Sequence, residues 1–128
     1  MAIDVRRDRR AAYRHGIAAE AIASLLLIGK GFRILARRYR TPLGEIDLIA
    51  KRGQLLVFVE VKARASQAAA LEAIGAEAKT RIVAASDLWL ARHPDAAAFD
   101  MRYDIVAVTP WRLPLHVPDA FRPGWDKE

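Results

Sequence analysis

Two short apolar segments that carry charged residues, and that lie only a few residues apart, constrain this chain more than any other feature. The segments GEIDLIA (residues 44–50) and LLVFVEVKAR (residues 55–64) are rich in Ile, Leu and Val, which favours β-strands. The Arg52–Gly53 pair between them fits a two-residue hairpin loop, with glycine taking the positive φ. Charge in such apolar strands is costly unless it is paired, bound to a metal or used in chemistry. The hairpin is therefore the first place to look for a site.

The register that this loop predicts gathers four charged residues on one face of the hairpin. Asp47 is expected to lie opposite Phe58, and Glu45 opposite Glu60. Because side chains alternate along a strand, the predicted charged face comprises Glu45, Asp47, Glu60 and Lys62. The predicted apolar face comprises Ile46, Leu48, Val57, Val59 and Val61. Two acids in diagonal contact beside a lysine form a hard-oxygen site for Mg²⁺ or Mn²⁺ next to a cation.

The chemistry that needs such a set is phosphodiester hydrolysis. Carboxylates can hold a divalent ion that polarises a phosphoryl group and acidifies a bound water, while an ammonium offsets developing negative charge. The other interpretation is that Glu60 and Lys62 are solvent-facing strand charges and that Asp47 is an acid close to the turn. Alternating charge is common on half-exposed hairpins, so spacing alone leaves both interpretations open.

The stretch YRTPLGEIDLIAKRGQLLVFVEVKAR (residues 39–64) resembles the signature of the YraN family of small bacterial proteins, in which GEIDLI and FVEVK blocks follow each other closely. That family resembles the PD-(D/E)XK nuclease superfamily, which includes type II restriction endonucleases, archaeal Holliday junction resolvases and the tRNA-endonuclease-like fold. The likeness also covers GIAAEAIASLLLIGKGFRILARRYR, a lysine-bearing helix around Lys79, MRYDIVAV and LHVPDAF. It implies an α/β fold with a restriction-endonuclease-like αβββαβ core, a mixed sheet flanked by helices.

The resemblance also implies roles for particular residues. Asp47 takes the place of the motif aspartate, and Glu60 and Lys62 take those of the catalytic E-x-K pair. Metal ligands are then Asp47, Glu60 and, from the first helix, Glu20. The implied nucleic-acid contacts are Arg38, Arg40, Arg64 and Lys79. Two departures stand out, because Ile46 replaces the proline before the aspartate and Arg38 replaces a frequent asparagine.

Without the resemblance, several of these residues have a simpler interpretation. Glu20 is then a solvated acid on a helix, and Lys79 a surface lysine. The dense basic cluster of the first strand could bind a nucleic-acid backbone or be a solvated strand face. That cluster comprises Lys30, Arg33, Arg37, Arg38 and Arg40.

Composition limits the class of protein. The chain has 128 residues and 53% hydrophobic content, enough for one compact core, so we expect a single domain over residues 1–128. A formal net charge of +6 favours polyanionic partners. The absence of cysteine excludes disulfides and thiol catalysis. The N-terminus has no signal-peptide apolar region and no stretch reaches membrane-spanning length, so we expect a cytoplasmic protein without a membrane partner.

Periodicity places the remaining elements. We expect a loose basic arm over residues 1–10, a helix over 11–28, a strand over 32–39, a mobile loop after Arg64, a helix over 71–92 and a strand over 99–108. Arg102 and Asp104 are expected to form a structural ion pair. The proline-rich tail is expected to cover a core edge or a partner surface with Trp111, Phe121 and Trp125, and residues 123–128 to be loose. The scattered histidines are not assigned to a metal.

Three hypotheses about function follow from these residues. The leading one is a Mg²⁺- or Mn²⁺-dependent endonuclease acting on DNA, branched or structured, that could work as a homodimer. The alternative is a non-catalytic nucleic-acid-binding protein that retains the nuclease fold. The third is an accessory protein whose tail aromatics dock on another protein. Clustered acids favour the first, because a pure binder of phosphate gains nothing from carboxylates that repel it.

Overall fold

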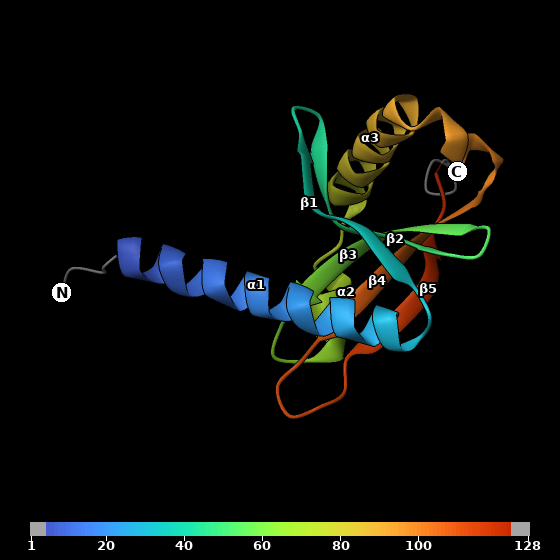
Figure 1. Ribbon diagram of the computed structural model, residues 1–128. Helices are drawn as coiled ribbons and strands as arrows, with labels where there is room; N and C mark the ends of the chain where they lie inside the picture. Colours follow the sequence, from blue (N-terminus) through green and yellow to red (C-terminus); the bar gives the residue numbers. More distant parts are fainter. Residues whose placement is uncertain (1–4, 124–128) are drawn as a thin grey trace.

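A five-stranded mixed sheet forms the centre of the protein (Figure 1). The computed structural model of the chain describes residues 5–123, with side chains from residue 16 onward. The elements are α1 (Val5–Gly29), β1 (Arg33–Thr41), β2 (Gly44–Arg52), β3 (Leu55–Ala63), α2 (Gln67–Glu72), α3 (Ala76–Arg92), the 3-10 helix η1 (Pro94–Ala98), β4 (Asp100–Val108) and β5 (Leu115–Phe121). The strands follow the order β1-β2-β3-β4-β5; β3 and β4 pair in parallel and the other neighbours pair antiparallel. The predicted α/β fold is confirmed, and it is consistent with a restriction-endonuclease-like architecture.

Each face of the sheet is covered by one long helix, as the ribbon shows (Figure 1). On one face, α1 packs Ala19, Ala23 and Leu27 onto a cluster of sheet residues that includes Leu48, Val57, Val59, Val61 and Val106. On the other face, α3 packs Ile82, Ala85 and Trp89 onto a second cluster that includes Ile46, Ile49, Leu56, Phe58, Tyr103 and Phe121. Because β3 is buried on both faces, its sequence is a nearly continuous apolar run.

The first helix is longer than its periodicity predicts. It begins at Val5, so residues 5–10 are helical where we expect a loose arm, and residues 1–4 lie outside the described chain. The stretch after Arg64 is also more ordered than expected, because α2 forms there. The Ser66 side chain caps α2 by accepting a hydrogen bond of 3.1 Å from the Ala69 amide.

The C-terminal segment contains a strand that the sequence analysis did not predict. β5 pairs with β4, and Phe121 within it is buried in the α3 face of the sheet rather than lying over an edge. Trp111, in the loop before β5, is fully exposed. Residues 124–128, including Trp125, lie outside the described chain. The expected loose tail, residues 123–128, therefore falls outside it except for Pro123. None of the helices in the described chain combines the length and apolar character needed to span a bilayer.

The β2–β3 hairpin turns one residue later than predicted. Arg52 pairs with Leu55, so the loop is Gly53–Gln54 rather than Arg52–Gly53, and Gly53 has a φ of 59°. Phe58 therefore lies opposite Ile49 instead of Asp47. The shift amounts to two residues along the partner strand, which preserves the face of each side chain. Extended by one residue, the observed register would place Asp47 level with Glu60 rather than diagonal to it.

Candidate functional site

Asp47 lies where β2 separates from β3. The pairing between these strands ends at Leu48 and Val59, and Asp47 immediately precedes Leu48 in β2. Beyond that point β2 continues with β1 as a two-stranded hairpin that reaches along α3 (Figure 1). The Asp47 Oδ2 atom accepts a hydrogen bond of 2.8 Å from the amide of Val61. The carboxylate thus replaces the strand partner that the Val61 amide lacks. Glu60 follows Val59 on β3, so it lies at the same level of the sheet.

A change of side-chain face accompanies this separation. Strict alternation puts Ile46 and Leu48 on one face, but Leu48 packs under α1 whereas Ile46 packs under α3, so the prediction for Ile46 is wrong. The neighbouring strand changes face at the same level, because Ala36 and Tyr39 both pack on the α3 side although they are three residues apart. Between them Arg38 has a φ of 53°, in the left-handed region, which breaks the regular alternation.

Asp47, Glu60 and Lys62, the predicted catalytic residues, meet at this point. Glu60 is only 9% exposed, and its Oε1 atom lies 3.1 Å from the Lys62 ammonium. Burial and then the neighbouring Glu60 raise the pKa of Asp47 to about 7, although the Val61 amide opposes the shift. Burial also raises the pKa of Glu60, and Lys62 moderates that rise. The site therefore holds two carboxyl groups that repel each other and only one adjoining ammonium.

Glu20 reaches the same region from α1. Its charge contributes to the raised pKa of Asp47. Its own carboxylate is held by Arg38, whose Nε atom donates a hydrogen bond of 2.6 Å to Oε2. A cavity of about 190 Å³ beside the site is lined by Gly16, Glu20, Arg38, Arg40, Glu45, Ile46 and Asp47. Arg38 and Arg40, predicted as nucleic-acid contacts, therefore line the same cavity as Asp47, and the Arg40 Nε atom lies 3.6 Å from Oε2 of Glu45.

The donor set can be tested against a divalent cation. Asp47 and Glu60 offer adjacent hard oxygen atoms, and a bound cation would offset the negative charge that their burial disfavours. Mg²⁺ typically takes one or two protein carboxylates and fills its other positions with water and substrate phosphate, so these two residues suffice. Among the residues that the structure describes, no group of three or more His, Asp or Glu side chains is placed to hold an ion. Glu20, the third predicted ligand, is bound to Arg38.

Residues 19–108 match the model of the family described as Uncharacterised protein family UPF0102. The chain belongs to this family. A UPF0102 protein of Rhizobium etli (strain CIAT 652) is 61% identical over 113 residues, 88% of this chain and 93% of the relative. A UPF0102 protein of Agrobacterium fabrum is 57% identical over 122 residues, which cover 94% of this chain and all of the relative. A UPF0102 protein of Brucella canis is 55% identical over 121 residues, which cover 94% of this chain and 96% of the relative. The resemblance to the YraN family is consistent with this membership.

The UPF0102 match includes the other two predicted nucleic-acid contacts, which lie apart from Asp47. Arg64 is exposed just beyond the end of β3, where its amide donates to the carbonyl of Val108 and its guanidinium donates to that of Ala63. Lys79 lies on α3, and its ammonium is 5.7 Å from the centre of the Phe121 ring. Neither residue lines the Asp47 cavity. Arg64, two residues beyond Lys62, is near the site in sequence.

A second polar cluster lies on β4 and β5. Arg102 donates two hydrogen bonds of 2.8 Å to Asp104, which confirms the predicted structural ion pair. His116 also contacts Asp104, at 2.8 Å, and Lys30 contacts His116, at 2.8 Å; neither contact follows from a local sequence pattern. An ammonium only donates, so Nδ1 of His116 accepts and Nε2 donates to Asp104. All four groups satisfy one another, which indicates a structural network.

Proposed function

We propose that this protein is a metal-dependent nuclease that hydrolyses phosphodiester bonds in DNA, including branched or structured DNA. The observation that carries the proposal is the pair of adjacent carboxyl groups of half-buried Asp47 and buried Glu60, with Lys62 beside them. Such a pair destabilises an apolar sheet unless a proton or a cation compensates it. A protein that needed only structural polarity here would be better served by neutral residues, so the presence of two acids beside the single ammonium of Lys62 supports a working site.

Asp47 and Glu60 would hold a Mg²⁺ or Mn²⁺ ion, which when bound supplies a Lewis acid and a more acidic water. In hydrolysis, a water oxygen forms a bond to phosphorus while one P–O ester bond breaks. The Lys62 ammonium, oriented by Glu60, would donate a hydrogen bond that positions the water and would offset negative charge on the phosphoryl oxygens. Arg40, on the rim of the cavity, would contact a neighbouring phosphate.

The test compares isosteric variants of the two acids. Mn²⁺ is titrated by calorimetry into the wild type, Asp47→Asn and Glu60→Gln, and each protein is then incubated with branched and with linear DNA in Mn²⁺ or EDTA. We expect both variants to lose metal binding and cleavage together. Asp87→Asn removes an exposed carboxylate on α3 and serves as the matched control, with both properties unchanged. Cleavage that persists in both active-site variants would overturn the proposal.

One observation favours the non-catalytic alternative. Glu20 is tied to Arg38, and the described residues contain no ready three-ligand group, so the site holds fewer protein ligands than the resemblance implies. If the protein binds nucleic acid without cutting it, Mn²⁺ gives no binding heat and DNA binding is weakened by salt but survives Asp47→Ala. The same titration and incubation distinguish the two functions.

A further inference from the structure

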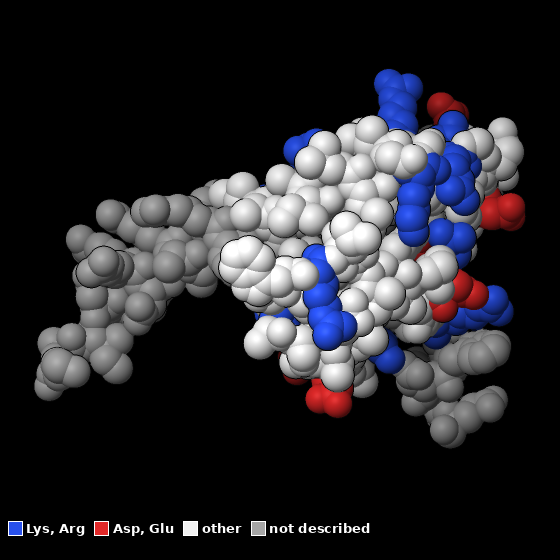
Figure 2. Space-filling view, turned by 90° about the horizontal axis from the view of Figure 1, so that it is seen from below, with Lys and Arg blue, Asp and Glu red and all other residues white. Residues whose placement is uncertain are grey.

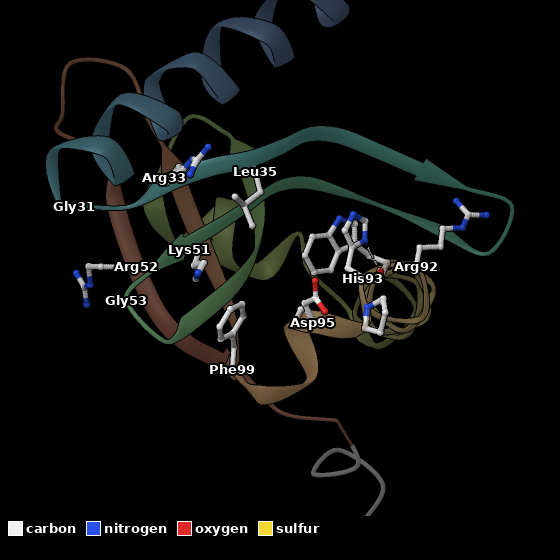
Figure 3. A pocket seen from close by; sticks show the side chains of 13 residues that line it. Gly31, Arg33, Leu35, Lys51, Arg52, Gly53, Arg92, His93, Asp95 and Phe99 are labelled. Carbon is white, nitrogen blue, oxygen red and sulfur yellow. Dashed lines mark hydrogen bonds between the residues drawn. The ribbon is translucent and has the colours of Figure 1, made fainter.

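A groove of about 780 Å³ lies between two parts of the fold (Figure 3). On one side are the beginning of β1 and the end of β2, and on the other are the C-terminal end of α3 and η1. None of the residues proposed for hydrolysis lines it. Its volume is within the range of pockets that bind small ligands. The lining residues that matter here are Arg33, Lys51, Arg52, Arg92, His93 and Phe99. The groove is therefore a second, larger candidate binding surface.

The groove carries an excess of positive charge. Four of its side chains are Lys or Arg, against a single carboxylate from Asp95. Within the described chain, none of the four cations forms an ion pair: Lys51 lies over the Phe99 ring, Arg52 lies over the Phe32 ring, and Arg92 donates to the Tyr39 hydroxyl. Seen from below, Lys and Arg side chains gather toward one end of the molecule, with some Asp and Glu among them (Figure 2). Such a surface suits a ligand that brings several negative charges.

The groove also contains a fixed aromatic surface. The exposed His93 ring stacks on the buried Trp89 ring, with centroids 4.0 Å apart and planes 13° apart. His93 Nδ1 lies 2.7 Å from the Trp89 carbonyl, and because a carbonyl only accepts, Nδ1 carries the proton. Stacking and hydrogen bond together hold the ring in place. Figure 3 shows His93 beside the hollow, with Lys51 and Phe99 across it.

We propose that this groove binds a single-stranded segment of DNA. Cations beside a fixed aromatic ring are the combination that binds single strands, since the cations contact phosphates and the ring stacks on a base. A duplex is a poorer fit, because its base faces are already stacked on one another and cannot reach His93. An acidic peptide would use the cations but would leave the aromatic surface without a partner.

The edge strand β1 connects this groove with the Asp47 cavity. Its exposed arginines are Arg33, Arg37 and Arg40. Arg33 lines the groove and Arg40 lines the Asp47 cavity, with Arg37 between them. A single strand held in the groove could thus follow β1 toward Asp47. This extends the proposed function, but binding in the groove requires neither a metal nor cleavage.

The test measures binding of a fluorescently labelled 15-nucleotide oligothymidylate by anisotropy, in EDTA and over a range of salt concentrations. Arg33→Ala combined with Arg92→Ala should weaken binding about tenfold or more and lower the salt slope by about 1.4, which is 0.7 for each of two phosphates that these arginines neutralise. Arg112→Ala, which removes an exposed arginine from the β4–β5 loop outside the groove, is the charge control and should have little effect. His93→Ala should weaken binding by at least about fivefold, whereas His93→Phe, which keeps an aromatic ring, should stay within about twofold of wild type.

Several results would overturn the proposal. The first is binding by the Arg33/Arg92 double variant that equals that of the Arg112→Ala control. The second is an unchanged affinity in His93→Ala together with tighter binding of duplex than of single strand. The third is competition by an acidic peptide as effective as that by unlabelled oligothymidylate. Thermal melting confirms that each variant folds. If Asp47→Asn cuts DNA as well as the wild type while groove variants still lose oligonucleotide binding, the proposed function fails and this inference stands.

Discussion

The carboxylate of Asp47 accepts a hydrogen bond from the backbone amide of Val61 across the point where β2 and β3 separate, at 2.8 Å. This contact does two things at once. It satisfies a β3 amide that the departing strand leaves without a partner, and it fixes the acid beside Glu60 in a half-buried position. Burial and the neighbouring Glu60 raise the pKa of Asp47 in this position to about 7, although the hydrogen bond from Val61 opposes the rise.

Asp47→Asn should make the protein more stable at pH 8. The amide oxygen of asparagine can still accept from Val61, and the repulsion with Glu60 disappears. The folded-state pKa of about 7 is above the ordinary value of 3.8, so the protonated acid stabilises the fold at low pH and this contribution is lost as pH rises toward 7. We expect a gain of the order of 2 kcal/mol at pH 8 and none below about pH 4.

Urea denaturation of the wild type and Asp47→Asn at pH 4 and pH 8, without divalent metal, checks this prediction. The relevant quantity is the difference between the two proteins, because groups remote from Asp47 titrate equally in both and only Asp47 and its neighbour Glu60 contribute to the difference. Asp87→Asn is the control and should give the same difference at both pH values. A stability gain in Asp47→Asn that did not change with pH would contradict the assigned cause.

Arg38 should tolerate glycine better than alanine. Its φ of 53° lies in the left-handed region, which strains any residue with a Cβ atom. Arg38→Ala and Arg38→Gly both remove the guanidinium that holds Glu20, so their comparison isolates the backbone effect. Arg38→Gly should be the more stable of the two by about 1 kcal/mol. Thermal denaturation measures the stability of both variants. Higher stability of Arg38→Ala would show that the β1 backbone relaxes at this position.

Gly44 should not tolerate even alanine. A Cβ atom there would overlap with the carbonyl oxygen of Arg81 on α3 and lie 2.7 Å from the carbonyl carbon, so the helix backbone would have to move. We expect Gly44→Ala to lower the free energy of unfolding by about 2 kcal/mol or more. Gly29→Ala is the control, because nothing lies within 4 Å of a Cβ built at Gly29. Equal denaturation midpoints for the two variants would contradict the close approach of β2 and α3.

The meeting of Asp47, Glu60 and Lys62 could be predicted because it depends on strand alternation and on a short loop, both visible in the sequence. Even with the loop misplaced by one residue, the faces were right for Leu48, Val57 and Val59. The predicted face of Ile46 was wrong because regular alternation breaks here, beside Arg38 on the neighbouring strand. The left-handed φ of Arg38 has no signature in the sequence, since an arginine normally continues a strand. The Glu20–Arg38 contact depends on how α1 packs against the sheet, which no local pattern encodes.

β5 was missed for a different reason. Pro118 in LHVPDAF argues against a central strand, but β5 is an edge strand, where proline is tolerated. Likewise, the basic cluster at Lys30 to Arg40 was visible in the sequence, but its relation to His93 was not. The two segments lie some sixty residues apart in the chain, and only the tertiary fold brings Arg33 and His93 to one groove.

The network around Asp104 should set the acid stability of the fold. Burial alone would raise the pKa of this fully buried acid, but hydrogen bonds from His116, Arg102 and the Asp119 amide outweigh burial and hold the pKa at about 2. Because the folded value lies below the ordinary 3.8, the contribution is fully present above about pH 4 and is lost as pH falls through 2. Asp104→Asn should therefore destabilise the protein by about 2 kcal/mol at pH 7 and by much less near pH 2. Urea denaturation measures the free energy of unfolding at the two pH values, with Asp87→Asn as the control. Equal losses of stability in Asp104→Asn and Asp87→Asn would contradict the role of the network.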